Sequence, residues 1–183
     1  IKKSSKLSSK KPNLMNEFRL QGTDGIRRET RLAFSEETGL TPQETFLKLG
    51  FITEEFIEIY AYAHIEELIL KEKMLPGDNV VIGWDPRDPK GNFTSALVRG
   101  VCKAGANALI LGIVPTPLVP MYMLYKNALA GFMLTASHNP RDQNGVKIFC
   151  SFRGLKLLPK NDMTLTRAVL KVNPSMLKKL PLK

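Results

Sequence analysis

Three polar loops hold the residues of this sequence that are best suited to chemistry. They are residues 22–27 (GTDGIR), 83–87 (GWDPR) and 135–140 (TASHNP), and the third is followed closely by 144–147 (NGVK). Ser137 lies among small and polar residues directly after an apolar run, where a loop can present its hydroxyl to a ligand. Lys147 follows a flexible Asn-Gly pair, and a lysine is a cation that a phosphorylated serine or a phosphate ester binds. The pattern favours phosphate chemistry around Ser137.

The neighbouring Ser137 and His138 do not form the pair that a serine hydrolase needs. In an extended chain, adjacent side chains point to opposite sides, whereas a nucleophile and its base must lie within hydrogen-bond reach. The sequence also lacks the Gly-x-Ser-x-Gly turn that exposes the nucleophile of α/β-hydrolases. We therefore exclude a catalytic triad.

Strands alternate with helices along the part of the chain that must position these loops. We expect helices over 41–50, 53–73, 93–104, 118–125 and 160–173, and strands over 80–84, 108–113, 130–134, 146–149 and 155–158. This alternation predicts an α/β domain with three α/β/α layers and a mixed, mostly parallel sheet. Ligands of such sheets collect where strands end, and the loops at Asp85 and Ser137 lie just past predicted strands.

The net charge of +10 is concentrated at the two ends of the chain. Residues 1–11 hold five lysines and no acid, and residues 151–183 hold eight basic residues and one acid. Residues 12–150 hold 14 basic and 16 acidic residues, so the expected folded part is close to neutral. Nucleic-acid binders carry their basic residues on the folded face that contacts phosphates. We therefore do not expect nucleic acid as a partner.

Composition also predicts the domain organisation. Residues 1–13 are rich in Lys and Ser and too poor in apolar groups to fold, so we expect a flexible basic tail. Residues 14–160 are expected to form the domain that carries the serine loop. Residues 161–183 are expected as a helix or basic tail, or as the truncated start of a next segment, and the end from 173 shows no evident packing partner. The chain begins with Ile1 rather than Met, so we expect a fragment or a processed product.

Neither a membrane nor secretion is expected. Residues 104–125 carry no charge, but three prolines and two glycines interrupt this run, and proline breaks a continuous spanning helix. A buried strand, a turn and a short helix fit this run better. No apolar run near the N-terminus has the form of a secretory signal. Cys102 and Cys150 have neither metal-site nor redox-site spacing, so we expect two small buried residues in a reducing compartment.

Together, the loops resemble the α-D-phosphohexomutase superfamily, in the order in which its members carry them. Residues 135–140 with 144–147 resemble the active-site serine loop of that family, and residues 22–27 resemble its N-terminal motif. Residues 81–87 are similar to its second strand and loop, and residues 115–117 (PTP) to a loop before the serine strand. The family's enzymes have four domains, and the resemblance covers the first.

The resemblance implies an activity and its cofactors. Members of the family, which include phosphomannomutase, phosphoglucomutase and phosphoglucosamine mutase, interconvert hexose 1-phosphates and hexose 6-phosphates. By this resemblance, Ser137 is a phosphoserine that donates its phosphoryl group, and a bisphosphorylated sugar then returns the other phosphate. Mg²⁺ bound through the phosphate of Ser137, and a hexose 1,6-bisphosphate as activator, are implied as well. The implied partners are a hexose phosphate and the remaining mutase domains, and the implied location is cytoplasmic.

The resemblance also implies roles for individual residues. Lys147 falls on the family lysine proposed to assist proton transfer, and Arg27 falls on the arginine near the seryl phosphate. The loop itself is shaped by His138 and Asn139. The other positions that match the phosphate-binding loops are Thr135, Asp24 and Asn144.

Simpler interpretations of these residues stay open. Lys147 fits a solvated surface lysine, and Arg27 fits an ion-pair partner of Asp24 or Asp85. His138 fits a residue that only satisfies backbone groups. Asp85 and Arg87, which the second loop carries, fit a structural role better than a catalytic one.

The sequence departs from the family pattern in two places and lacks other parts of it. Arg28 stands where the family commonly has glycine, and the segment 35–50 is longer than the usual link. None of the six Asp residues lie two positions apart, so the family's Asp-x-Asp-x-Arg metal loop is absent from this sequence. Two hypotheses stay open. The chain is either the first part of a mutase, inactive alone, or a non-catalytic phosphate- or partner-binding domain derived from that family.

Overall fold

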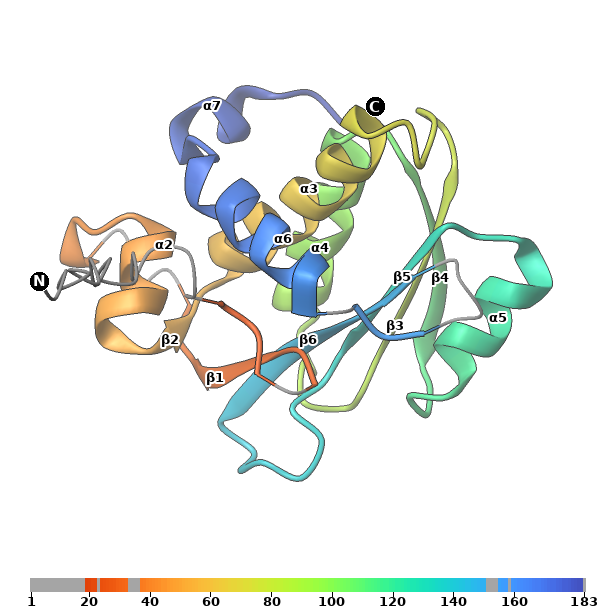
Figure 1. The fold of residues 1–183 in the computed structure, drawn as a ribbon. Coiled ribbons are helices and arrows are strands. Elements are labelled where there is room, and N and C mark those ends of the chain that lie inside the picture. The colour runs from red at the N-terminus through yellow and green to blue at the C-terminus, as the bar shows by residue number, and fades with distance from the viewer. Residues whose placement is uncertain (1–18, 23, 33–36, 151–154, 158, 183) are drawn as a thin grey trace, which may run out of the picture.

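A six-stranded mixed sheet organises the structure (Figure 1). The computed structural model describes residues 19–22, 24–32, 37–150, 155–157 and 159–182. In their order across the sheet, the strands are β2 (Phe51–Ile52), β1 (Ile26–Thr30), β6 (Gln143–Cys150), β5 (Ala130–Leu134), β3 (Asn79–Trp84) and β4 (Asn107–Ile113). Three neighbouring pairs run parallel, whereas β6 runs antiparallel to both of its neighbours. The prediction of a mixed, mostly parallel sheet is confirmed.

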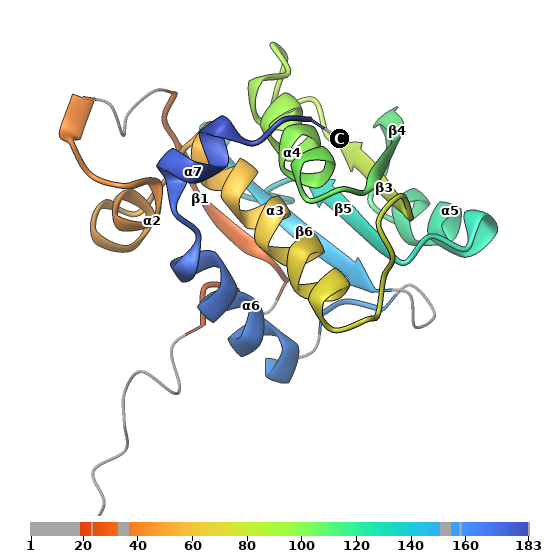
Figure 2. The ribbon, with the colours of Figure 1, turned by 90° about the horizontal axis from the view of Figure 1, so that it is seen from above.

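Helices cover both faces of the sheet, as the α/β/α prediction requires (Figures 1 and 2). One face is covered by α3 (Glu54–Leu70), α4 (Asn92–Lys103) and α6 (Pro159–Lys171), and the other by α5 (Leu118–Lys126). Three shorter segments are α2 (Pro42–Glu44), the π-helical η2 (Thr45–Leu49) and α7 (Pro174–Lys179). In Figure 1, α2 lies beside the β2 end of the sheet.

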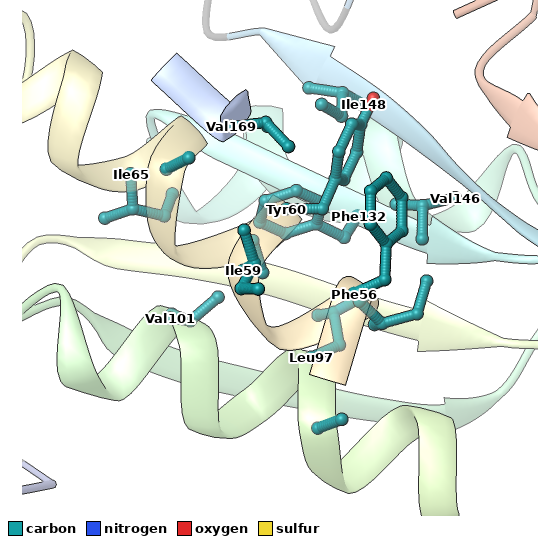
Figure 3. Close-up of a cluster of buried hydrophobic side chains, with 14 of the residues drawn as sticks. Phe56, Ile59, Tyr60, Ile65, Leu97, Val101, Phe132, Val146, Ile148 and Val169 are labelled. Atoms are coloured by element: carbon teal, nitrogen blue, oxygen red, sulfur yellow. The ribbon is translucent and has the colours of Figure 1, made fainter. Parts of the chain in front are cut away.

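The core is divided between the two faces. The larger apolar cluster lies between the sheet and α3, where Phe56 and Tyr60 are fully buried near Phe132 of β5 (Figure 3). α4 approaches α3 closely at Gly100, where a Cβ atom would lie 2.3 Å from the carbonyl oxygen of Glu58. Because interiors are close-packed, only glycine allows the two helices to lie at this distance. A smaller cluster, which includes Met123, packs under α5.

The expected starts of the helices at Thr41 and at Thr53 are both confirmed. Thr41 caps α2 through a capping box with Glu44, and Pro42 occupies the first helical position. The following η2 ends at Gly50, which has a φ of +76°. Thr53 caps α3 by accepting a hydrogen bond from the N–H of Phe56.

Two strands were not expected from the sequence, and one expected strand is nearly lost. β1 is mostly charged and β2 has only two residues, so neither shows the apolar pattern of a strand. Both are strands because they pair with distant partners, β1 with β6 and β2 with β1. Within the described residues, the expected return strand over 155–158 is reduced to one bridge between Lys156 and Phe149.

The C-terminal region corrects a further expectation, since its last described residues do have a packing partner. Asn173 caps α7 by accepting hydrogen bonds from two backbone N–H groups, and Leu177 is buried. The ammonium of Lys103 in α4 donates to the carbonyl oxygen of Leu177 at 2.9 Å and also pairs with Glu58 at 2.7 Å. α7 is thereby tied to α3 and α4. The expected N-terminal tail, residues 1–13, lies outside the described residues.

The uncharged run 104–125 forms the turn after α4, all of β4 and most of α5, as expected. Among the described residues, no helix combines the length and the apolar character needed to cross a membrane. Cys102 and Cys150 are free thiols, but both are partly exposed rather than buried. Each lies near the end of its element, so neighbouring side chains cover it only in part.

His64 makes the stability of the fold sensitive to mild acid. Its side chain is buried, its ring lies edge-on to Phe132 at 5.6 Å, and its Nε2 has no hydrogen-bond partner. Burial lowers the pKa of His64 from its usual 6.5 to about 4. Between pH 6.5 and about pH 4, His64 is therefore protonated in the unfolded chain but neutral in the folded chain. The free energy of unfolding falls as the pH drops through this range.

We predict that His64 contributes a loss of about 2 kcal/mol in the free energy of unfolding between pH 7 and pH 5. Urea unfolding at both pH values measures it. In His64→Phe this part of the loss should disappear, whereas His138→Phe, which replaces an exposed histidine, should keep it. An unchanged pH difference in His64→Phe would contradict the assignment.

Candidate functional site

Ser137 lies on the loop that follows β5, in a backbone conformation that few residues adopt. Thr135 and Ala136 before it are buried, whereas Ser137 itself is partly exposed. Ser137 has a φ of +55°, in the left-handed region. For a residue with a Cβ atom this costs about 1–2 kcal/mol, so the surrounding structure must hold it there.

A closed hydrogen-bond network holds the serine loop. The N–H of Ser137 donates to Thr135 Oγ1 at 2.9 Å, and this hydroxyl donates to Asp85 Oδ2 at 2.6 Å. The guanidinium of Arg87 donates to the carbonyl oxygens of Ser137 (2.5 Å), Asn139 (2.8 Å) and Pro140 (2.7 Å). Asp85 and Arg87 also form an ion pair at 3.1 Å. Both side chains reach the loop because β3 and β5 are parallel neighbours, so the loops after them leave the same end of the sheet (Figure 1).

A second cluster forms around Asp24 and contains the other two charged candidates. Asp24 Oδ2 lies 2.9 Å from Lys147 Nζ and 3.1 Å from a guanidinium nitrogen of Arg27, and Oδ1 lies 2.5 Å from Lys156 Nζ. Partial burial raises the pKa of Asp24, but the hydrogen bonds and charges of Lys156 and Lys147 outweigh it, so the pKa lies below its usual range. Lys147 is buried rather than a solvated surface lysine. Arg27 is an ion-pair partner of Asp24, one of the interpretations left open.

The Asp24 cluster forms because β1, which follows Asp24, lies directly against β6, which carries Lys147. Arg27 is paired with Gly145, and Ile26 with Val146. Gly25 has a φ of +88°, and a Cβ atom on it would lie 2.1 Å from the carbonyl oxygen of Val146. Any other residue at this position would push β1 away from β6. In the described part of the chain, no hydrogen bond or ion pair joins the side chains of the two clusters; the β5–β6 backbone connects them.

The remaining candidates have conformational roles in this structure. The amide of Asn139 donates to Gln143 Oε1 at 2.7 Å, and Asn144 is buried with its Oδ1 accepting from the N–H of Gly145 at 2.8 Å. Both bonds shape the loop between β5 and β6. His138 is exposed. Arg28 does not crowd the site, because its guanidinium lies over the ring of Phe46 at 5.3 Å.

A polar cavity adjoins the Asp24 cluster. It has a volume of about 210 Å³, and its lining includes Asp24, Lys147 and Lys156 together with Gln21 and Asp162. Gln21 and Asp162 are buried, and the side-chain nitrogen of Gln21 and one carboxylate oxygen of Asp162 have no hydrogen-bond partner. The cavity therefore offers both hydrogen-bond donors and acceptors next to the lysines.

Lys156 belongs to the site but was not identified from the sequence, and Asp85 and Arg87 were assigned only a structural part. Lys156 lies in the segment that follows β6 in the chain, and an antiparallel bridge to Phe149 places it beside this strand. From there its ammonium group pairs with Asp24. Nothing local marks a lysine between two leucines as a site residue. For Asp85 and Arg87, the only sign in the sequence was their position just after a predicted strand. That this strand, β3, lies next to the serine strand, β5, is decided only by the fold.

The described side chains of this domain do not gather into a magnesium site on their own. Mg²⁺ requires several oxygen ligands in octahedral geometry. Among the residues that the structure describes, no group of three or more His, Cys, Asp or Glu side chains gathers to hold a metal ion. The two carboxylates nearest to the candidate residues are already engaged, Asp24 by three cations and Asp85 by Arg87 and Thr135.

Proteins of known kind resemble this chain in sequence. Residues 19–175 match the family model "phosphoglucomutase/phosphomannomutase, alpha/beta/alpha domain I". A phosphoglucosamine mutase of Acetivibrio thermocellus is 37% identical over 139 residues, which are 76% of this chain and 26% of that protein. The phosphoglucosamine mutase of Francisella tularensis subsp. novicida is 46% identical over 136 residues, 74% of this chain and 26% of that protein. The chain thus spans about a quarter of the length of these relatives.

Solved structures agree in fold and in extent. A Thermus thermophilus protein assigned as a phosphomannomutase superimposes with a TM-score of 0.60 at 27% identity, over 81% of this chain and 29% of its own. A phosphoglucomutase/phosphomannomutase family protein of Burkholderia thailandensis gives a TM-score of 0.53 at 21% identity, over 85% and 30%, and supports the fold alone. Because the family model covers most of the residues and the fold agrees with it, the chain belongs to the phosphoglucomutase/phosphomannomutase family and corresponds to its α/β/α domain I.

Proposed function

We propose that this domain carries the phosphoserine of a phosphohexomutase, which interconverts a hexose 1-phosphate and a hexose 6-phosphate through a bisphosphorylated sugar. The observation that carries the proposal is Ser137, a partly exposed serine held in a left-handed conformation by a dedicated network. A plain surface loop has no need of such a constraint.

The proposed transfer uses the residues of both clusters. In one direction, the phosphoryl group of Ser137 passes to a sugar hydroxyl: the Ser137 Oγ–P bond breaks, a sugar O–P bond forms, and the proton of the hydroxyl is taken up at the site. In the other direction, Ser137 receives the second phosphate of the sugar. Lys147 is proposed to assist the proton transfer and Arg27 to balance the charge of the phosphate. Asp24, which binds both cations, holds them in place when no phosphate is present.

The substrate and the other requirements are proposed by way of the relatives. Because the relatives described above are named phosphoglucosamine mutases, glucosamine phosphate is the first substrate to test. Mg²⁺ would bind through the phosphate of Ser137 together with ligands from outside the described residues. We further propose a hexose 1,6-bisphosphate as activator and the remaining mutase domains as partners, in the cytoplasm. Turnover by the 183-residue chain alone is not expected.

We predict that Ser137 is phosphorylated in protein isolated from its native source. Intact-mass measurement and phosphopeptide mapping across residues 131–147 would detect the modification, and Ser137→Ala should abolish it. Ser95, which is exposed on α4, serves as the control serine and should remain unmodified. An unmodified Ser137 would favour a non-catalytic phosphate- or partner-binding domain instead.

Asp24 should compete with phosphate for the cations of the site. Asp24→Asn removes the carboxylate from Lys147, Lys156 and Arg27, so we predict that the chain binds inorganic phosphate at least about tenfold more tightly. Calorimetric titration at neutral pH measures the affinity. Glu72→Gln removes one negative charge from an exposed position at the end of α3 and should leave the affinity unchanged. Equal affinity in wild type and Asp24→Asn would show that these cations do not face a phosphate.

The stability of Asp24→Asn at different pH values should show the contribution of the ion pairs of Asp24. The pKa of Asp24 is lowered, so its contribution to stability is complete above the ordinary carboxyl range and is lost as the pH falls through the lowered value. Asp24→Asn should therefore be less stable than wild type at pH 7, by about 1–3 kcal/mol. The difference should shrink as the pH falls below about 4. Urea unfolding curves at both conditions measure it, and a difference that grows with acid would contradict the ion pairs.

A further inference from the structure

We propose that Arg87 is a positioning residue for Ser137, and that it fixes the serine from within this domain before any other part of a longer protein contributes. This inference rests on the proposed function, because positioning matters only if Ser137 carries a phosphoryl group. The hydrogen bonds of Arg87 converge on the loop that carries Ser137.

The guanidinium of Arg87, which has five N–H donors, makes four hydrogen bonds within this domain. Its Nε donates to Asp85 Oδ2 at 3.1 Å, and one terminal nitrogen donates to the carbonyl oxygens of Asn139 and Pro140. The other terminal nitrogen donates to the carbonyl oxygen of Ser137 at 2.5 Å. A planar guanidinium offers these donors in a fixed fork, whereas a lysine ammonium is a single point with rotating donors. Lysine is therefore not an adequate substitute at this position.

The network forms hydrogen bonds with the backbone groups on both sides of the Cα atom of Ser137. Arg87 holds the carbonyl group, and Thr135 Oγ1 holds the N–H group. Asp85 links the two, since its Oδ2 accepts from both Arg87 and Thr135, and its Oδ1 accepts from the backbone N–H of Arg87 at 3.0 Å. Fixing both peptide groups that flank Ser137 fixes its φ and ψ, and so the direction of the Cα–Cβ bond that carries its hydroxyl.

Arg87 and Arg27 bind different groups: Arg87 binds the backbone of the serine loop, whereas Arg27 binds the carboxylate of Asp24. The side chain of Arg87 is mostly buried, with 18% exposure, and its donors are directed to the backbone of the loop rather than to solvent. Four of its five donors are therefore occupied within this domain and are not available to a phosphate. The carboxylate of Asp85, similarly occupied, is not free to bind a metal ion. Arg27 instead pairs with a carboxylate that a phosphate can replace.

Amide hydrogen exchange tests whether Arg87 holds the loop. In Arg87→Lys and Arg87→Ala, the N–H of Ser137 should exchange at least about tenfold faster than in wild type, because its partner Thr135 is no longer held. Added guanidinium should slow the exchange in Arg87→Ala, where it can refill the vacated position. The matched control is Arg99→Ala, which removes an arginine that pairs with Glu58 on α3 at 2.9 Å and should leave Ser137 unchanged. Unchanged exchange in Arg87→Lys would overturn the proposal.

Phosphoryl uptake tests whether this positioning serves the reaction. The variants are made in the native source, and the isolated protein, at its natural length, is dephosphorylated and given a hexose 1,6-bisphosphate. A sugar O–P bond breaks, the Ser137 Oγ–P bond forms, and the serine proton passes to the released sugar oxygen. Since a misplacement of about 1 Å costs on the order of 100-fold, we expect Arg87→Lys to take up phosphate about 100-fold more slowly. Arg99→Lys should match wild type.

The outcomes separate the two proposals. Uptake by Arg87→Lys at the wild-type rate, despite a loosened loop, overturns the positioning role and leaves the proposed function intact. Absence of uptake by wild type overturns the proposed function, and the positioning role in the reaction falls with it. In that case the exchange measurement still decides whether Arg87 holds the loop. Slow uptake that guanidinium partly restores in Arg87→Ala supports both.

Discussion

The close approach of β1 to β6 is the constraint on which the rest of the site depends. β6 lies between β5 and β1 and runs antiparallel to both. It therefore connects the strand before the serine loop with the strand of the N-terminal motif. Two glycines make this possible. A Cβ atom on Gly145 would lie 2.0 Å from the carbonyl oxygen of Ile26, and one on Gly25 would lie 2.1 Å from that of Val146. Without these glycines, Asp24 and Lys147 would not meet.

The site divides its work between two networks of different character. Around Ser137, hydrogen bonds from Arg87 and Thr135 go to backbone groups and fix a conformation. Around Asp24, three cations gather on one partly buried carboxylate, which holds them in place without a ligand. In the proposed function, a phosphate takes the place of this carboxylate. For the proposed transfer, preorganisation of this kind would remove the need to reorder the site.

The described residues contain only part of what the proposed reaction needs. The chain corresponds to domain I and spans about a quarter of the relatives that it matches. Its described residues offer a serine, a lysine and an arginine, yet no gathered set of metal ligands. A domain that holds the phosphoryl carrier and leaves cation and sugar recognition to other segments would show this combination.

Local sequence determined most of the helices, most of the strands and the identity of the candidate loops. Thr41 and Thr53 mark helix starts through caps that depend on neighbours only three residues away, so they were predictable from the sequence. The serine loop and the N-terminal motif were likewise readable as motifs, because their residues are consecutive. α7 was missed, although Asn173 followed by Pro174 is a helix start, because the helix is short and Leu177 is its only buried residue.

Tertiary structure alone decided which residues share a site. β1 and β2 became strands only through partners more than 20 residues away, as the pairings of Ile26 with Val146 and of Glu29 with Phe51 show. The pairing of Lys156 with Asp24 and the hold of Arg87 on the serine loop also join residues far apart in the chain. Strand order sets these contacts, and strand order follows from the packing of the whole sheet rather than from any local pattern. For this reason the sequence identified Ser137, while only the fold identified what holds it.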